Sequence, residues 1–173
     1  MDNSNPSNIS NLKITIFQAY LFWENVDKNL QNLALRLSMG IKEKTDLIIL
    51  PEMFNTGFSM NTDTLAEGMD GKTIQWMRAT AEKYDCVVTG SLIISEDGHY
   101  YNRLIWMMPD GSHAHYDKRH LFGLGDEDKN YTAGDKKVIV NLKGWKIMLG
   151  ICYDLRFPVW LRNQNEEYDI LLL

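Results

Sequence analysis

The sequence predicts a single α/β domain in which buried strands alternate with amphipathic helices. Residues 25–39 and 71–84 place apolar side chains at helical spacing. Residues 46–50 form an apolar run of the kind found in a strand that is covered on both faces. The chain has 173 residues, 45% of them apolar, which is enough to bury a core without disulfides or bound metals.

Charge and cysteine content exclude several classes of protein. The chain has 18 basic and 23 acidic residues, and no stripe of lysine and arginine that would follow a phosphate backbone, so we expect no nucleic-acid partner. The N-terminus lacks the basic and apolar regions of a signal peptide, and no apolar run approaches the ~18 residues of a membrane span. Two cysteines are too few for a disulfide framework. We therefore expect a cytoplasmic protein with reduced thiols and no membrane partner.

The first half of the chain reads as strands separated by helices. Residues 1–11 are polar and rich in asparagine and serine, so we expect a flexible tail and a domain that begins at Leu12. A strand at 13–18 precedes the helix at 25–39, and the strand at 46–50 stops at Pro51, after which we expect a functional loop. The helix at 71–84 leads into a strand at 86–95 and a turn at 96–98.

The second half is richer in strands. We expect strands at 100–108, 113–116, 137–142 and 145–151, a helix at 157–163 and a strand at 168–173. Residues 118–136 form a loop of 19 residues, and ordered loops of this length are usually functional. The final apolar strand stops without a turn or polar cap. We therefore expect residues 12–173 to be a domain whose C-terminal part is missing from this chain.

Two charged residues at strand ends are candidates for catalysis. Glu52 directly follows a buried strand, where a partly desolvated carboxylate acts as a general base; the alternative is a turn residue or helix cap. Lys118 begins the long loop, and a lysine beside a cleft stabilises an oxyanion; the alternative is a solvated lysine. We interpret His113, His115 and His120 as surface residues, because no third ligand at metal-binding spacing accompanies them, and we expect no metal.

Cys152 is the most distinctive candidate. It follows an apolar strand at a tight turn and precedes a predicted helix, an arrangement that exposes a nucleophile and places backbone N–H groups beside it. The alternative is a cysteine packed as a small apolar residue, which is our interpretation of Cys86 in the middle of a strand. Beside a cation we expect the pKa of the Cys152 thiol to fall.

Three segments together resemble a known family. Residues 51–55, 116–122 and 150–158 resemble, in order and spacing, the signature segments of the nitrilase superfamily of carbon–nitrogen hydrolases. The resemblance covers most of the chain from Leu12. Residues 55–58 and 154–160 are most similar to the omega-amidase branch, whose members release ammonia from 2-oxo acid amides.

This resemblance implies a fold and a set of roles. The implied fold is a four-layer α-β-β-α sandwich with two mixed β-sheets, forming a homodimer through one helical layer and using no cofactor. By position, Cys152 matches the nucleophile, Glu52 the general base, Lys118 the oxyanion-stabilising lysine and Glu127 the second glutamate beside them. The backbone N–H of Tyr153 would share the oxyanion with Lys118. We expect Lys118→Ala to lose nearly all turnover and to stay folded.

The implied activity is hydrolysis of the terminal amide of small 2-oxo acid amides to the dicarboxylic acid and ammonia, through a cysteine thioester. Two alternatives remain open: hydrolysis of N-carbamoyl amino acids or other small amides, and a non-catalytic fragment or interaction module. Arg156 either binds a substrate carboxylate or pairs with an acidic residue. Phe58, Phe122 and Tyr131 either line the pocket or pack in the core.

Overall fold

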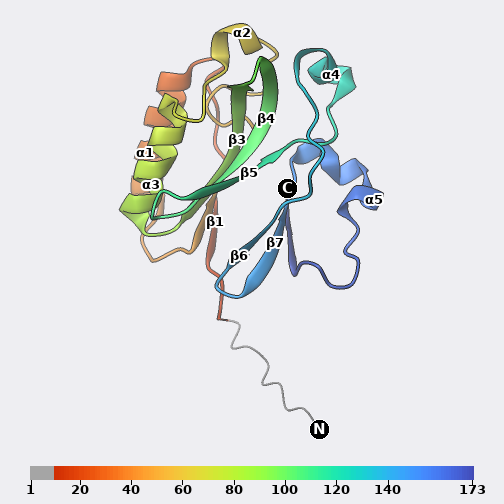
Figure 1. The fold of residues 1–173 in the computed structure, drawn as a ribbon. Helices are drawn as coiled ribbons and strands as arrows, with labels where there is room; N and C mark the ends of the chain where they lie inside the picture. The colour runs from red at the N-terminus through yellow and green to blue at the C-terminus, as the bar shows by residue number, and fades with distance from the viewer. Residues whose placement is uncertain (1–9) are drawn as a thin grey trace.

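In the computed structural model, residues 10–173 form two mixed β-sheets that pack face to face, with helices on the free face of the larger sheet (Figure 1). The α/β class and the two mixed sheets expected from the sequence are confirmed. Residues 1–9 of the expected tail lie outside the described residues. The backbone carbonyls of Ser10 and Asn11 accept hydrogen bonds from the side chains of Trp145 and Lys143, respectively, so the chain already contacts the second sheet before Leu12.

The larger sheet of residues 10–173 contains its strands in chain order. These are β1 (Ile14–Ile16), β2 (Leu47–Ile49), β3 (Val87–Glu96), β4 (His99–Met107) and β5 (His113–Asp117). The first three are parallel neighbours, whereas β4 is antiparallel to both β3 and β5. Strand β5 consequently runs in the same direction as β2. The carboxyl ends of these two strands therefore lie at the same edge of the sheet.

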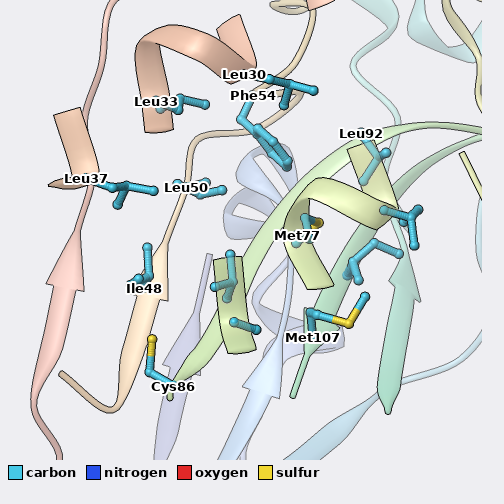
Figure 2. Close-up of a cluster of buried hydrophobic side chains, with 14 of the residues drawn as sticks. Leu30, Leu33, Leu37, Ile48, Leu50, Phe54, Met77, Cys86, Leu92 and Met107 are labelled. Carbon is cyan, nitrogen blue, oxygen red and sulfur yellow. The ribbon is translucent and has the colours of Figure 1, made fainter. Parts of the chain in front are cut away.

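Two helices cover one face of this sheet. Helix α1 (Val26–Gly40) begins after Asn25, whose side chain accepts a hydrogen bond from the N–H of Lys28, and α3 (Lys72–Tyr84) follows Gly71. Because their apolar stripes face the strands, they form the main core with them. Figure 2 shows Leu30, Leu33 and Leu37 of α1 and Met77 of α3 beside Ile48, Leu50, Leu92 and Met107 of the sheet and its loops.

Cys86 belongs to the same core (Figure 2). It lies just before β3 and not in the middle of a strand, because the ladder of paired residues begins at Val87. Cys86 is buried, and its pKa is raised to about 11, first by burial and then by the nearby charge of Asp85. A thiol in this environment is unreactive. The interpretation of Cys86 as a packing residue is confirmed.

The smaller sheet covers the opposite face of the larger one. It contains β6 (Ile139–Leu142), β7 (Trp145–Leu149) and β8 (Ile170–Leu172), with β7 antiparallel to β6 and parallel to β8. A second core fills the space between the sheets. Its buried members are Leu47, Val87, Leu104, Trp106, Tyr116, Ile147, Leu149, Ile151 and Leu172.

Short helical segments occupy the loops at the carboxyl ends of the strands. They are α2 (Thr62–Leu65), the 3-10 helix η1 (Gly123–Gly125), α4 (Glu127–Asn130), the 3-10 helix η2 (Cys152–Arg156) and α5 (Pro158–Leu161). Sequence periodicity did not predict α2, because four residues are too short to show a helical repeat. Among the described helices, none combines the length and the apolar character needed to span a lipid bilayer.

Candidate active site

Three of the predicted site residues follow strands that end close together. Glu52 comes shortly after β2 and Lys118 directly after β5. Since both strands end at one edge of the sheet, the side chains meet there, with Lys118 Nζ 2.7 Å from Glu52 Oε1. Cys152 begins η2 after β7 of the smaller sheet, and its thiol interacts with Glu52. The fold thus brings together residues that lie up to 100 positions apart in the sequence.

The long loop supplies a fourth charged group. Glu127 begins α4, and its two carboxylate oxygens lie 2.9 and 3.1 Å from Lys118 Nζ. Lys118 and Glu127 are almost completely buried, with side-chain exposures of 1% and 0%. Burial of Lys118 opposes its charge, but attraction to Glu52 and Glu127 outweighs burial and raises its pKa. Lys118 therefore stays an ammonium near neutral pH, between two carboxylates.

Asn102 completes this cluster, and sequence reasoning missed it. It lies in β4, is completely buried, and its side-chain amide nitrogen is 2.9 Å from both Glu52 Oε1 and Glu127 Oε1. Its backbone carbonyl accepts a hydrogen bond from the N–H of Lys118. Asn102 stands inside a strand rather than at its end, so no local sequence signal marked it.

Cys152 has a strained backbone and a thiol that resists ionisation. Its φ angle is 39°, in the left-handed region that residues with a side chain seldom adopt. The residue is exposed, yet the atoms packed around its sulfur make burial the largest influence on its pKa. Burial, and then the charge and hydrogen bonding of Glu52, raise the pKa of the Cys152 thiol, and the opposing effect of Lys118 is smaller.

The expected fall of the thiol pKa is therefore wrong. The first physical reason is burial of the sulfur. The second is that the charge of Lys118 is already balanced by Glu52 and Glu127, so the sulfur experiences little net positive charge. At neutral pH the thiol of Cys152 carries its proton. Nucleophilic attack then requires a base that accepts this proton, and Glu52 is the carboxylate that lines the same cavity as Cys152.

A buried aspartate joins the Cys152 turn to the Lys118 segment. Asp154 is completely buried and accepts hydrogen bonds from Ile151 N at 3.0 Å, Tyr116 Oη at 2.7 Å and His120 N at 3.0 Å. Tyr116 and His120 stand on either side of Lys118 in the chain. The position of the nucleophile turn is thus coupled to that of the lysine. Asp154 appeared in the sequence only as part of the family signature.

The histidines differ from one another in their surroundings. His113 and His115 are exposed, as expected. His120 is only partly exposed: its ring stacks on Phe157 with centroids 3.7 Å apart, and its Nδ1 lies 2.7 Å from Asp154 Oδ1. The surface interpretation is wrong for His120, because the Asp154 contact draws it inward. Within residues 10–173 no cluster of three His, Cys, Asp or Glu side chains has the geometry to hold a metal ion.

Aromatic side chains surround the lysine. The Phe58 ring lies 5.3 Å from Lys118 Nζ, its centroid is 6.4 Å from that of Phe122, and Phe122 meets Tyr153 edge to face at 5.0 Å. Tyr131 is different: it is buried in a separate apolar cluster, and its hydroxyl donates to a backbone carbonyl of the loop after Glu52. This geometry favours core packing for Tyr131 and leaves Phe58 and Phe122 beside the charged cluster.

A cavity of about 450 Å³ lies next to Cys152 and Glu52, between the ends of the two sheets. Arg156 does not line it; the residue is exposed and makes no ion pair within the described part of the chain. Tyr153 lies in the first turn of η2, where backbone N–H groups have no acceptor inside the helix. The cavity walls are mostly apolar and include Gln18, Ile49, Pro51, Thr89, Leu104 and Leu172.

The chain is similar in sequence and in structure to known proteins. Residues 13–173 match the model of the carbon-nitrogen hydrolase family. The omega-amidase YafV of Yersinia enterocolitica is 40% identical over 164 residues, and the 2-oxoglutaramate amidase of Bacillus subtilis is 37% identical over 126 residues, or 70% of this chain and 48% of that protein. The crystal structure of XC1258 from Xanthomonas campestris, a CN-hydrolase superfamily protein with an arsenic adduct in its active site, has a TM-score of 0.88 and 38% identity.

The chain is shorter than these relatives. The alignment with the Yersinia protein covers 95% of this chain and 62% of the relative, and the alignment with XC1258 covers 92% of this chain and 63% of that structure. The family match to residues 13–173 includes every strand and helix described above.

Proposed function

The chain belongs to the carbon–nitrogen hydrolase family, and on this basis we propose that it carries the catalytic centre of a cysteine-dependent amidase. The proposed reaction is hydrolysis of the terminal amide of a small 2-oxo acid amide to the dicarboxylic acid and ammonia. The names of the omega-amidase and 2-oxoglutaramate amidase relatives support this class of substrate.

One observation carries the catalytic proposal. A carboxylate, an ammonium and a thiol gather at the edge of the sandwich, where Glu52 forms an ion pair with Lys118 and lines the same cavity as Cys152. The carboxylate accepts a proton, the ammonium holds a fixed positive charge, and the thiol is the nucleophile. These are the groups that acyl transfer from an amide requires.

In the first half of the reaction Glu52 accepts the thiol proton and Cys152 Sγ attacks the amide carbon. The oxygen of the tetrahedral intermediate gains a negative charge, which Lys118 and the backbone N–H of Tyr153 stabilise. The C–N bond then breaks, and the nitrogen leaves as ammonia with the proton that Glu52 held. A thioester between Cys152 and the acyl group remains.

In the second half a water molecule replaces the amine. Glu52 takes a proton from the water, whose oxygen attacks the thioester carbon, and the proton returns to Sγ as the acid product leaves. Glu127 keeps Lys118 in place through both halves, because its two oxygens contact the ammonium. Every step uses side chains and one backbone N–H of this chain, together with water.

The proposal also covers the residues that bind the substrate, the cellular location and the oligomeric state. Phe58 and Phe122, beside Lys118, would line the acyl site. Arg156 lies outside the cavity beside Cys152, so we assign it no contact with the substrate. Tyr131, which packs in the core, would support this wall from behind. We place the enzyme in the cytoplasm as a homodimer that acts on small molecules.

The test is the mass of the intact protein before and after a quenched incubation with 2-oxoglutaramate, together with ammonia release. The protein should gain an acyl adduct and release ammonia. Cys152→Ala should do neither while it keeps the wild-type melting temperature, because Cys152 is at the surface. Cys86→Ala, in the core, is the matched control and should still form the adduct.

Two results would contradict the proposal at different levels. Ammonia from N-carbamoyl amino acids or other small amides, without turnover of 2-oxoglutaramate, would change the substrate and keep the mechanism. Absence of both adduct and ammonia across a panel of amides, from a folded protein of the full natural length, would favour a non-catalytic module.

A further inference from the structure

Asn102 contacts each of the charged groups around Lys118. Its amide nitrogen donates to Glu52 Oε1 and to Glu127 Oε1, both at 2.9 Å, and its backbone carbonyl accepts from Lys118 N at 3.0 Å. The residue is completely buried in β4. Through these hydrogen bonds it joins strand β4 to the loop after β2 and to the long loop.

The chemistry of the partners determines how the amide is oriented. Ionised carboxylates only accept hydrogen bonds, so the nitrogen of Asn102, not its oxygen, must face Glu52 and Glu127. Each of its two hydrogens then serves one carboxylate. Two like-charged groups share the same pair of donors, Lys118 and Asn102, which lets both carboxylates remain close together.

The same contacts leave one oxygen of Glu52 available. Lys118 and Asn102 both donate to Oε1, at 2.7 and 2.9 Å. With Oε1 held by two donors, the rotation of the carboxylate is defined and Oε2 is the oxygen that can receive the thiol proton of Cys152. A base that is held in this way needs no reorganisation when the proton moves.

Asn102 also has a feature that is unfavourable for stability. Its Oδ1 atom is buried and has no hydrogen-bond partner within residues 10–173. An unpaired buried acceptor lowers stability, so a side chain kept only for packing would be apolar at this position. A polar residue at this buried position is explained if the hydrogen bonds from its amide nitrogen to the two carboxylates are needed.

We propose that Asn102 is a positioning residue for the reaction, whose side-chain amide holds Glu52 and Glu127 on Lys118 and directs Glu52 Oε2 to the thiol of Cys152. The inference rests on the proposed function, because it assigns Glu52 as the base. In the step that Asn102 supports, the Sγ–H bond breaks, the proton forms a bond to Oε2, and the electron pair stays on sulfur to attack the substrate.

Two measurements test the role of Asn102. The first is kcat and KM of Asn102→Leu on the amide that wild type hydrolyses. The second, which needs no substrate, is the pH midpoint of alkylation of Cys152 by iodoacetamide, followed by the mass of the peptide that contains it. The charged groups that influence this thiol are Glu52, Lys118 and Glu127, so the titration is repeated in a Glu52→Gln background.

The expected result is specific to positioning. Glu52 raises the pKa of Cys152, so a carboxylate that Asn102 no longer holds should let the alkylation midpoint fall part of the way towards that of Glu52→Gln. In the Glu52→Gln background, Asn102→Leu should cause no further shift. The kcat should fall about 10- to 100-fold, a part of what a positioned base contributes, with KM within roughly 3-fold of wild type.

Two controls separate positioning from loss of structure. Ile105→Val alters a buried residue of the same strand that faces the helices, and it should keep the wild-type midpoint and kcat. Asn102→Ser keeps one hydroxyl donor and a polar site, and it should give an intermediate midpoint. If Asn102→Leu does not fold, Asn102→Ser decides the question by the same criteria.

The proposal is overturned if the midpoint of the Asn102 variant equals that of wild type. It is equally overturned if the shift is the same with Glu52 and with Gln at position 52, since Asn102 would then act on the thiol without the base. If no amide is hydrolysed, the proposed function fails, while the alkylation experiment still decides whether Asn102 positions Glu52.

Discussion

Lys118 is a buried cation whose surroundings determine both its stability and its use. Glu52 and Glu127 contact it at 2.7 and 2.9 Å, so the three groups together carry a negative charge. The raised pKa of Lys118 means that it acts as a fixed charge and does not donate a proton. Burial also affects the expectation that a Lys118 variant stays folded. Without this ammonium, a buried carboxylate has no compensating charge, which lowers the stability of the variant.

We predict that Lys118→Met loses both turnover and stability. Turnover should fall about 10² to 10³-fold, as for loss of an oxyanion donor. The free energy of unfolding should fall by about 3–5 kcal/mol, because Glu127 remains buried without its cation. Ammonia release and urea denaturation measure the two effects. The structure thus adds a cost in stability to the expectation that a Lys118 variant stays folded and loses turnover.

The double variant Lys118→Met with Glu127→Gln is the control. It removes the buried charge together with its partner, so part of the lost stability should return while turnover stays low. A single Lys118→Met variant that denatures at the wild-type urea concentration would show that the buried ion pair adds nothing net to stability.

At the scale of elements, the loop from Lys118 to α4 depends on contacts at both of its ends. Phe122 N donates to Glu127 Oε2 at 2.7 Å, and Gly134 N donates to the carbonyl of Lys118 at 2.9 Å. The returning chain therefore passes directly against the lysine segment. A Cβ atom at Gly134 would overlap the carbonyl oxygen of Asp117, so only glycine allows this approach.

We predict that Gly134→Ala displaces the Lys118 segment. The backbone has to move, which should cost about 1–3 kcal/mol of unfolding free energy and reduce kcat, because Asp117 directly precedes the lysine. Gly40→Ala is the matched control: a Cβ there meets only Phe17 at 3.5 Å, and stability should change by less than ~1 kcal/mol. Equal melting temperatures and equal kcat for the two variants would contradict this account of the loop.

At the scale of the molecule, polar contacts supplement the apolar core between the sheets. Asp46, just before β2, accepts hydrogen bonds from Lys13 N at 2.8 Å and from Lys143 Nζ at 3.0 Å. Lys13 precedes β1, and Lys143 lies in the turn between β6 and β7. Burial opposes the charge of Asp46, but these donors outweigh it and lower its pKa below the usual value.

The sign of this shift predicts a pH dependence. A carboxyl group whose pKa is lower in the folded state stabilises the fold above its unfolded pKa, and this contribution is lost as the pH falls through the folded pKa. At pH 7, Asp46→Asn should lower the unfolding free energy by about 1 kcal/mol. As the pH falls below about 4, the two proteins should converge, which denaturation at several pH values measures. A constant difference down to pH 2 would contradict the role of the charge.

Local sequence signals were sufficient for much of the fold, since α1 and α3 show the helical period over several turns. They also made Glu52, Lys118 and Cys152 candidates at strand ends, whereas the roles of these residues, and Glu127, came from the resemblance to a family. The local signals depend only on neighbours in the chain. The boundaries moved by one or two residues where strands end, because hydrogen-bonded pairing and not apolar character sets the last residue of a strand.

Other features depend on contacts between residues that are distant in the chain, and the sequence did not predict them. Asn102 gains its importance from Glu52 and Glu127, which are distant in the chain, and His120 lies inward because Asp154 accepts from it. No periodicity or motif reports such contacts. The helix α2 is missed for a different reason, since a single turn leaves no repeat to detect.

The amino-acid sequence by itself determined which groups are available for chemistry and in which order the elements follow, because strand and helix patterns are properties of neighbouring residues. Tertiary structure alone decided how the groups act. In the folded protein two carboxylates compensate the charge of Lys118, and the side chain of Asn102 donates a hydrogen bond to Glu52. The pKa of the Cys152 thiol is raised, although a nearby cation was expected to lower it. The reason is that the pKa values and electrostatic energies of the site depend on burial and on the distances between charges, and both are defined only when the two sheets are packed together.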